Sequence, residues 1–241
     1  MLVKLNNPSL FAKAIELMSE LIIEVKIKLT DFGLTITAID PASIAMVDLK
    51  IPKSAFSVYE PENQILCVNL EDLKKILKRC SAKSSLTLEK KENTLTIKID
   101  DRIKRSFSLN LIEIDSEEKD FPTLEYSSRV ELDSQDFVDS IEDCAVVSDA
   151  CSFVISEGKF IIEAKELNSA RSEFSSDEAK ISAENCKARY SLEYLQKFIK
   201  GSKLFPKTIL NFATEHPLKM DLLSENLIIN FLLAPRMEIE D

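Results

Sequence analysis

Apolar residues spaced three and four positions apart mark four amphipathic helices along the chain. The first follows Asn7-Pro8-Ser9, a capping residue and an early proline that are typical of a helix start, and its apolar face runs from Leu10 to Leu21. The others are predicted at residues 70–80, 134–145 and 192–200. Each is expected to pack through one side and to meet solvent on the other.

Alternating apolar and polar residues predict strands between these helices. They include residues 25–29 and 95–99 in the first half, and the neighbourhoods of Phe153, Ile161 and Ile181 in the second. About eight strands are expected in each half, and their short connections favour antiparallel pairing. The predicted fold class is therefore α+β, with two helices packed on antiparallel sheets in each half.

The second half of the chain repeats the first. Residues 70–78 recur as 192–200 with identical Leu, Glu, Leu, Lys and Lys at matching places, and residues 5–15 parallel 132–142. Two similarities in the same order at nearly the same offset favour an internal duplication. An acidic segment without periodicity lies between the repeats and is expected to be a surface linker. We therefore expect an N-terminal domain at 1–112, a connector at 113–128 and a C-terminal domain at 129–241.

Charge and composition narrow the function classes. The net charge is −10, which disfavours nucleic acid as a partner unless the basic residues gather on one surface. Only three glycines occur, so glycine-rich loops that cradle phosphates are absent. Five scattered cysteines without a C-x-x-C spacing indicate reduced, mostly buried thiols. With no apolar run of transmembrane length and no secretion pattern, the sequence predicts a cytosolic protein.

No catalytic constellation is visible. The single histidine, His216, lies in a predicted hairpin turn, and Cys144 and Cys151 are expected to be small buried residues. The carboxylates are scattered over helix faces and turns without the spacing of a cation site. The sequence predicts a protein that is not an enzyme and that holds neither a metal nor a cofactor.

Lysines gather on the polar faces of the second and fourth helices. A solvated face is the usual explanation of such a stripe, but equivalent lysines on two repeated helices would form one extended positive surface. Such a surface can contact phosphates without reading the bases. The lysines concerned are Lys74, Lys75, Lys78 and Lys83 in the first repeat, and Lys197, Lys200 and Lys203 in the second.

Three segments in this order are similar to one protein family. They are residues 33–47 with Ile39-Asp40-Pro41-Ala42-Ser43-Ile44, the helix at 70–78, and the ending 233–238 with its Leu-Ala-Pro-Arg. Together with the duplication and the acidic connector, the chain resembles proliferating cell nuclear antigen, the DNA sliding clamp of eukaryotes and archaea, over essentially its whole length. The resemblance implies a trimeric ring around duplex DNA, with helices inside and sheets outside, that acts as a processivity factor in replication and repair and has no catalytic activity.

The resemblance also implies which residues contact DNA and partners. Lys13, Lys75, Lys78 and Lys200 fall where the family has lysines facing DNA, and Lys74, Lys83, Lys197 and Lys203 are added as their helical neighbours. The family's pocket for a short partner peptide, which serves the DNA polymerase, the flap endonuclease and the DNA ligase, maps onto apolar residues of three segments. These are Ile39, Ser43, Ile44 and Met46; Phe121 and Pro122; and Pro217, Leu232, Ala234 and Pro235. Each of these residues by itself could equally be part of the core.

Subunit contact in the family is pairing of edge strands, and a clamp loader opens the ring. One candidate edge here carries Arg105, Phe107, Leu109 and Leu111, and the other carries Ala179, Ile181 and Ala183. A homotrimer is preferred, with a heterotrimer as the alternative. Localisation is expected to be cytoplasmic, at the nucleoid, for an archaeal protein and nuclear for a eukaryotic one.

Acidic residues stand at places where the family has basic ones. Asp139 and Glu142 lie on the third helix, and Glu193 begins the fourth. Because these acids repel phosphate, either DNA leans on the second and fourth helices or sister subunits supply the missing charge. Two alternatives remain at this point: a checkpoint-type clamp or clamp-like scaffold that binds protein partners, and a hydrolase on a duplicated β-rich fold, which the lone histidine disfavours.

Overall fold

The computed structural model describes residues 1–115, 117 and 119–237. The chain forms two compact units. The first unit contains Met1–Pro41, Val47–Phe121 and Ser224–Ile228, and the second contains Ala42–Met46, Pro122–Leu223 and the residues from Ile229 on.

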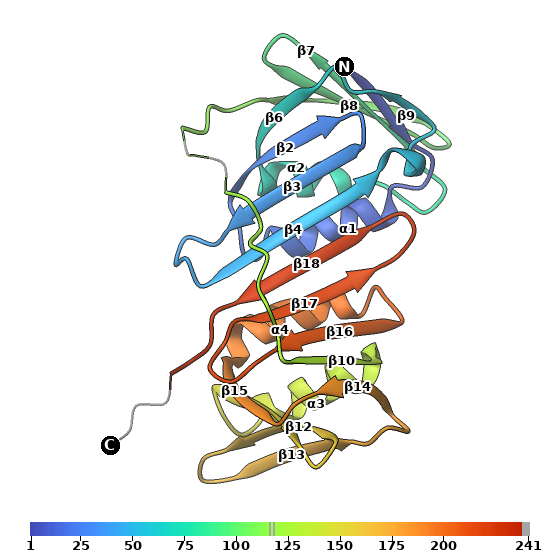
Figure 1. Ribbon diagram of the computed structural model, residues 1–241. Coiled ribbons are helices and arrows are strands. Elements are labelled where there is room, and N and C mark those ends of the chain that lie inside the picture. Colours follow the sequence, from blue (N-terminus) through green and yellow to red (C-terminus); the bar gives the residue numbers. More distant parts are fainter. Residues whose placement is uncertain (116, 118, 238–241) are drawn as a thin grey trace. The chain divides into compact units, whose positions relative to one another are not determined.

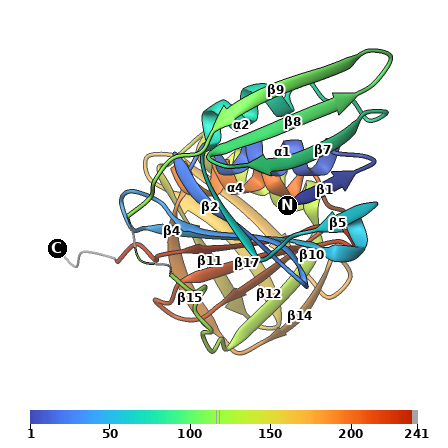
Figure 2. The same ribbon diagram turned by 90° about the horizontal axis from the view of Figure 1, so that it is seen from above.

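The first unit carries two helices and two series of hydrogen-bonded strands (Figure 1). Neighbouring strands follow the order β5-β1-β7-β8-β9 in one series and β4-β3-β2-β6 in the other. Figure 2 shows β7, β8 and β9 side by side, in agreement with their pairing. The elements are β1 (Leu2–Leu5), α1 (Ser9–Met18), β2 (Glu24–Thr30), β3 (Gly33–Ile39), β4 (Ala45–Pro52), β5 (Val58–Glu60), β6 (Gln64–Asn69), α2 (Leu70–Leu77), β7 (Ser85–Lys91), β8 (Thr94–Asp100) and β9 (Lys104–Asn110), with a 3-10 turn at Lys53–Ala55.

The second unit repeats this plan. Its strand orders are β14-β10-β16-β17-β18 and β13-β12-β11-β15, so each strand corresponds to the strand nine places earlier. This correspondence confirms the duplication that the sequence predicts. The elements are β10 (Ser128–Asp133), α3 (Ser134–Ala145), β11 (Ala150–Ser156), β12 (Lys159–Lys165), β13 (Ser169–Phe174), β14 (Ala179–Ala183), β15 (Cys186–Ser191), α4 (Leu192–Ser202), β16 (Lys207–Phe212), β17 (Leu218–Leu223) and β18 (Ile228–Leu233).

Apolar side chains between helices and sheets form the two cores. In the first unit, Ala14, Ile15 and Met18 of α1 are fully buried. In the second unit, Phe153 is the centre of an aromatic cluster, because its ring lies within 6.2 Å of the rings of Phe137, Phe160, Tyr190 and Phe212. Edge-to-face contacts of this kind add to the burial of apolar area. These cores hold the helices with their polar faces outward.

The predicted fold class is confirmed, with small differences in the elements. The sequence reasoning missed β5, which has only three residues, and β15, whose buried positions include the small Cys186 and Ala188. Helix α2 ends at Leu77 rather than near residue 80, because the next turn tightens: the Arg79 and Cys80 amides donate to the Ile76 and Leu77 carbonyls. No described helix has the length and apolar character that crossing a bilayer requires.

Candidate functional site

Helix α2 presents lysines because its start and its apolar face are both well defined. The Asn69 side chain caps the helix by accepting from the Glu71 and Asp72 amides at 3.0 and 3.2 Å. Acidic residues in the first turn and basic residues in the last turn complement the helix dipole. With its leucines buried, the helix holds Lys75 and Lys78 in solvent, at 64% and 53% side-chain exposure.

Each of these lysines already has an acidic partner in the first unit. Lys75 Nζ lies 3.2 Å from Asp72 Oδ1 within α2, and Lys78 Nζ lies 2.8 Å from Glu16 Oε1 of α1. The hydrogen bond with Glu16 raises the pKa of Lys78 above its ordinary value. Lys74 pairs with Glu71, and this contact lowers the pKa of the Glu71 carboxyl. The remaining predicted lysines of this unit, Lys13 and Lys83, are exposed.

The second unit shows a similar arrangement on α3 and α4. Lys203 Nζ lies 2.8 Å from Glu142 Oε1, which joins the two helices. Lys197 lies 3.2 Å from Glu193, with its ammonium 5.1 Å from the centre of the Tyr194 ring, and Lys200 is exposed. The acids at which the sequence departs from the family therefore all have partners: Glu142 and Glu193 pair with lysines, and the Asp139 carboxylate accepts a hydrogen bond from the Gln135 side-chain Nε2 at 2.7 Å.

These helix faces are suited to phosphate contact. Exposed ammonium groups such as those on α2 and α4 are able to attract phosphates electrostatically, and contacts of this kind carry no sequence information. The lysines are long and their pairs are exposed, so the carboxylates hold them weakly and a phosphate can compete for them. Chemically, each unit offers a weak and exchangeable surface for a polyanion.

Several predicted peptide-pocket residues come together within the second unit. The Ala234 amide donates to the Ile44 carbonyl at 2.9 Å, so the segment after β18 lies against the segment before β4. Ile44 is 39% exposed, and Ser43 beside it has a left-handed backbone with φ 58°. The other predicted members in this unit are half-buried: Met46, Pro122, Pro217, Leu232 and Pro235.

Tyr126 lies beside the turn that carries the predicted residue Pro217, and the sequence reasoning missed it. Its ring meets the His216 ring edge-on at 5.4 Å, next to Pro217. Burial raises the pKa of Tyr126 to about 12, and its hydroxyl has no hydrogen-bond partner among the described residues. Tyr190 donates to the His216 carbonyl at 2.8 Å and holds this turn, which lies between β16 and β17 as predicted. The available signal was a second aromatic residue in the acidic connector, five positions after Phe121.

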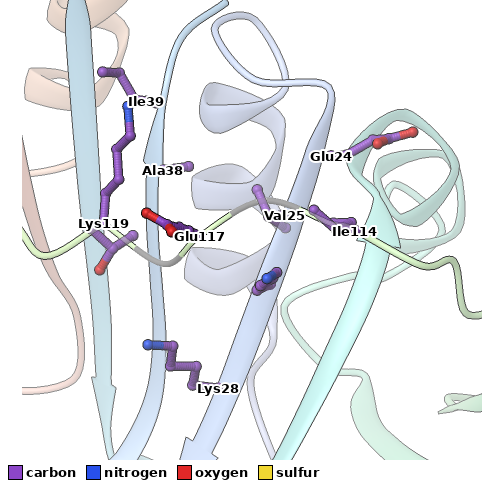
Figure 3. A pocket seen from close by; sticks show the side chains of 10 residues that line it. Glu24, Val25, Lys28, Ala38, Ile39, Ile114, Glu117 and Lys119 are labelled. Carbon is purple, nitrogen blue, oxygen red and sulfur yellow. The ribbon is translucent and has the colours of Figure 1, made fainter. Parts of the chain in front are cut away.

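The predicted residues Ile39 and Phe121 belong to the first unit. Both are half-buried. Ile39 lines a cavity of about 240 Å³ between the connector and the face of β2 and β3. Figure 3 shows Ile114, Glu117 and Lys119 of the connector passing over Val25 and Ala38. The sequence reasoning missed this cavity, whose other lining residues are Glu24, Lys26, Lys28 and Thr37.

Free sheet edges are the third feature. Strand β9 pairs only with β8 in the described strand order, and its Arg105, Phe107 and Leu109 are half-buried, with Leu111 buried just beyond it. Strand β14 pairs only with β10, with Ala179 buried, Ile181 half-buried and Ala183 exposed. Strand β13 is a second edge of the same unit, which the sequence reasoning missed.

The end of the described chain is tied to the second unit through Arg236. Its amide donates to the Arg189 carbonyl at 2.7 Å, and its guanidinium lies 2.8 Å from Asp149 Oδ2. This contact lowers the pKa of the Asp149 carboxyl. The sequence marked the Leu-Ala-Pro-Arg ending, but it did not reveal that the arginine fixes the path of Ala234 and Pro235. Cys144 and Cys151 are buried, as predicted.

Comparisons with known proteins agree over residues 1–237. The family model described as proliferating cell nuclear antigen, N-terminal domain, matches residues 1–120, and the model for the C-terminal domain matches residues 120–237. DNA polymerase sliding clamp 1 of Thermococcus kodakarensis is 36% identical over 236 residues, covering 95% of each chain. The DNA polymerase sliding clamp of Pyrococcus furiosus is 34% identical, with the same coverage.

Solved structures show the same fold. A crystal structure of proliferating cellular nuclear antigen from Entamoeba histolytica superposes with a TM-score of 0.91 at 22% identity, covering 98% of each chain. A chain of the PCNA2–PCNA3 complex from Sulfolobus tokodaii superposes with a TM-score of 0.89 at 27% identity, covering 99% of this chain and 100% of that chain.

Proposed function

Because this chain belongs to the proliferating cell nuclear antigen family and is a DNA polymerase sliding clamp, a processivity factor without catalytic activity, we propose that it encloses duplex DNA in a ring of three subunits. The polar faces of α1 to α4 would face the DNA. The observation that carries this proposal is the recurrence of exposed lysines on α2 and α4, at equivalent places in the two repeats. A closed ring holds DNA by topology, so weak phosphate contacts are enough and leave the ring able to slide.

The proposed DNA-contacting residues are those of the helix faces and their flanks. The exposed members carry the main contacts, and Lys74 and Lys197 are half-buried neighbours. Asp139, Glu142 and Glu193 make the surface less positive, so its affinity for DNA is expected to be modest and strongly salt-dependent. The full set is Lys13, Lys74, Lys75, Lys78, Lys83, Lys197, Lys200 and Lys203.

Replacing Lys75, Lys78 and Lys200 together by alanine is expected to weaken binding of duplex DNA at low salt and to reduce the slope of log affinity against log salt by up to about 3. The substitutions are expected to leave the fold intact, because all three side chains are exposed. Fluorescence anisotropy with a labelled duplex measures both quantities.

A matched triple variant, Lys91→Ala, Lys98→Ala and Lys159→Ala, removes the same charge from strands β7, β8 and β12. It is expected to bind DNA nearly as the unaltered protein does. Equal binding by the Lys75, Lys78 and Lys200 variant and the unaltered chain would show that these helix faces do not contact DNA.

A peptide-binding function is proposed for the apolar residues near the connector. A DNA polymerase, a flap endonuclease or a DNA ligase would bring a short peptide with aromatic and aliphatic anchors to them. Within the second unit, Ile44 and Ala234 form the best-defined part of this surface, because a backbone hydrogen bond joins them. A clamp loader would open the ring.

Assembly as a homotrimer is our preferred proposal. Edge-strand pairing would join β9 of one subunit to an edge of the next subunit's second unit, either β14, as the sequence suggested, or β13. The Sulfolobus tokodaii relative is described as a complex of PCNA2 with PCNA3, which keeps a ring of different subunits as the alternative. The archaeal relatives favour a cytoplasmic location at the nucleoid, whereas a eukaryotic clamp would be nuclear.

Light scattering tests the assembly. A homotrimer of 27.2 kDa chains has a mass of about 82 kDa over a range of concentrations. Leu109→Asp on β9 is expected to reduce the mass to that of a single chain, because it places a charge in the paired edge. Ile181→Asp on β14 and Ala170→Asp on β13 then show which edge is the partner. A single-chain mass for the unaltered protein would contradict the homotrimer and favour missing sister subunits.

The carboxylates on α3 and α4 favour one second candidate, a checkpoint-type clamp or clamp-like scaffold that binds proteins and seldom DNA. Retention on DNA separates the two. A replicative clamp stays on circular DNA after loading and slides off linear DNA, whereas a scaffold remains on neither.

A further inference from the structure

Each unit contains an ion pair that joins its two helices. In the first, Glu16 of α1 holds Lys78 of α2 at 2.8 Å, and in the second, Glu142 of α3 holds Lys203 of α4 at 2.8 Å. Within the helices the glutamates occupy equivalent positions, because Phe11, Ile15 and Glu16 match Phe137, Ile141 and Glu142 at an offset one residue shorter than that of the preceding strands, and the buried residues of α1 and α3 agree with this alignment. In the alignment of the repeats Lys78 corresponds to Lys200, whereas the lysine that pairs with Glu142 is Lys203, three residues later. The pairing between the two helices therefore recurs with a lysine at a different position.

These pairs contribute little to folding. All four side chains are about half exposed, between 46% and 53%. Exposed pairs are screened by water and add little net stability. We therefore expect these pairs to affect how the two lysines bind external anions such as phosphate, more than how the chain folds.

The acids around Lys78 affect any incoming phosphate. Glu16, whose carboxylate lies 2.8 Å from the Lys78 ammonium, raises the pKa of Lys78 most, and the charges of Glu71 and Glu20 raise it further. A DNA phosphate that takes Lys78 must displace Glu16 and then lies beside an uncompensated negative charge. The same holds for Lys203 and Glu142. Contact with DNA thus exchanges one anion for another instead of filling an empty site.

We propose that Glu16 and Glu142 compete with DNA phosphates for Lys78 and Lys203. This competition keeps the affinity of the clamp for DNA low enough for the clamp to slide. The inference rests on the proposed function, in which these helix faces meet DNA. As the duplex moves, each lysine passes between its own glutamate and successive phosphates. Lys78 and Lys203 therefore keep a counter-charge as they pass from one phosphate to the next, which lowers the barrier to sliding.

Glu16→Gln with Glu142→Gln tests the proposal on the full, assembled protein. Both changes keep the shape of the side chain and remove only the competing charge. The double variant is expected to bind a labelled duplex at low salt about 3- to 10-fold more tightly, the range that two exposed pairs support, with a steeper dependence on salt. Solution mass and thermal unfolding verify that assembly and folding are unchanged.

The control removes one carboxylate from a strand of each unit. Glu89→Gln with Glu163→Gln makes the same change in net charge, since Glu89 pairs with Lys91 and Lys98, and Glu163 with Arg171. It is expected to bind DNA nearly as the unaltered protein does. An equal gain in both double variants, or no gain in the helix variant, overturns the proposal. If the unaltered protein and both variants fail to bind DNA even at the lowest salt, the proposed function fails, and this inference with it.

A double-mutant cycle isolates one pair. Lys78→Ala is expected to weaken DNA binding more in the Glu16→Gln background than in the unaltered chain, because Lys78 is then available to phosphate without competition. Equal losses in the two backgrounds would show that Glu16 does not compete for this lysine, and would overturn the proposal for the first unit.

Discussion

Gly33→Ala is expected to destabilise the first unit by about 3 kcal/mol, measured by urea unfolding, because alanine fits neither the backbone conformation nor the space. Gly33 has φ +146°, which side chains rarely adopt. A Cβ here would stand 2.2 Å from the Ile51 carbonyl oxygen and 3.0 Å from the Lys53 nitrogen. Both obstacles are backbone atoms, and the Lys53 amide is already bound to the Phe32 carbonyl at 2.9 Å. Strand β3, which begins at Gly33 and ends at Ile39, would have to shift.

Gly158→Ala is the matched control in the second unit. It also has a positive φ, +75°, but a Cβ there meets nothing within 4 Å. Its cost is expected to be about 1 kcal/mol, from the backbone conformation alone. Equal losses from the two substitutions would show that the close approach of Ile51 and Lys53 to Gly33 is unimportant.

Ala234→Arg is expected to lower the affinity for a peptide with aromatic and aliphatic anchors by about 100-fold or more, since a charge would be buried beneath the bound peptide. The Ala234 amide is bound to Ile44, and Arg236 fixes the chain two residues later. The backbone therefore cannot turn the new side chain away. Isothermal titration with such a peptide measures the loss, and the solution mass is expected to stay unchanged.

Ala82→Arg adds the same residue at an exposed position after α2 and is expected to leave peptide affinity unchanged. Phe121→Ala provides a second variant, which removes an apolar anchor of the connector instead of adding a charge. Native affinity in both Ala234→Arg and Phe121→Ala would mean that the peptide binds elsewhere.

Much of the fold could be predicted because its signals are local. The four helices follow from apolar spacing, and most strands from alternation, since both patterns repeat within a few residues. The duplication was visible because α2 and α4 kept identical residues at matching places. Two strands were missed because their apolar patterns are weak: β5 has only three residues, and the buried positions of β15 include small side chains.

The sequence by itself determined the class of the molecule, its duplicated plan, its family and the set of lysines on two helices. Only the tertiary structure decided which acid each lysine holds, that Tyr126 lies against His216, and that Arg236 fixes the tail near Ala234. The reason is distance along the chain. Glu16 and Lys78 are 62 residues apart, and they meet only because buried faces of α1 and α2 bring their helices together. Periodicity shows which face of a helix is buried, but not which residue of another helix lies beside it.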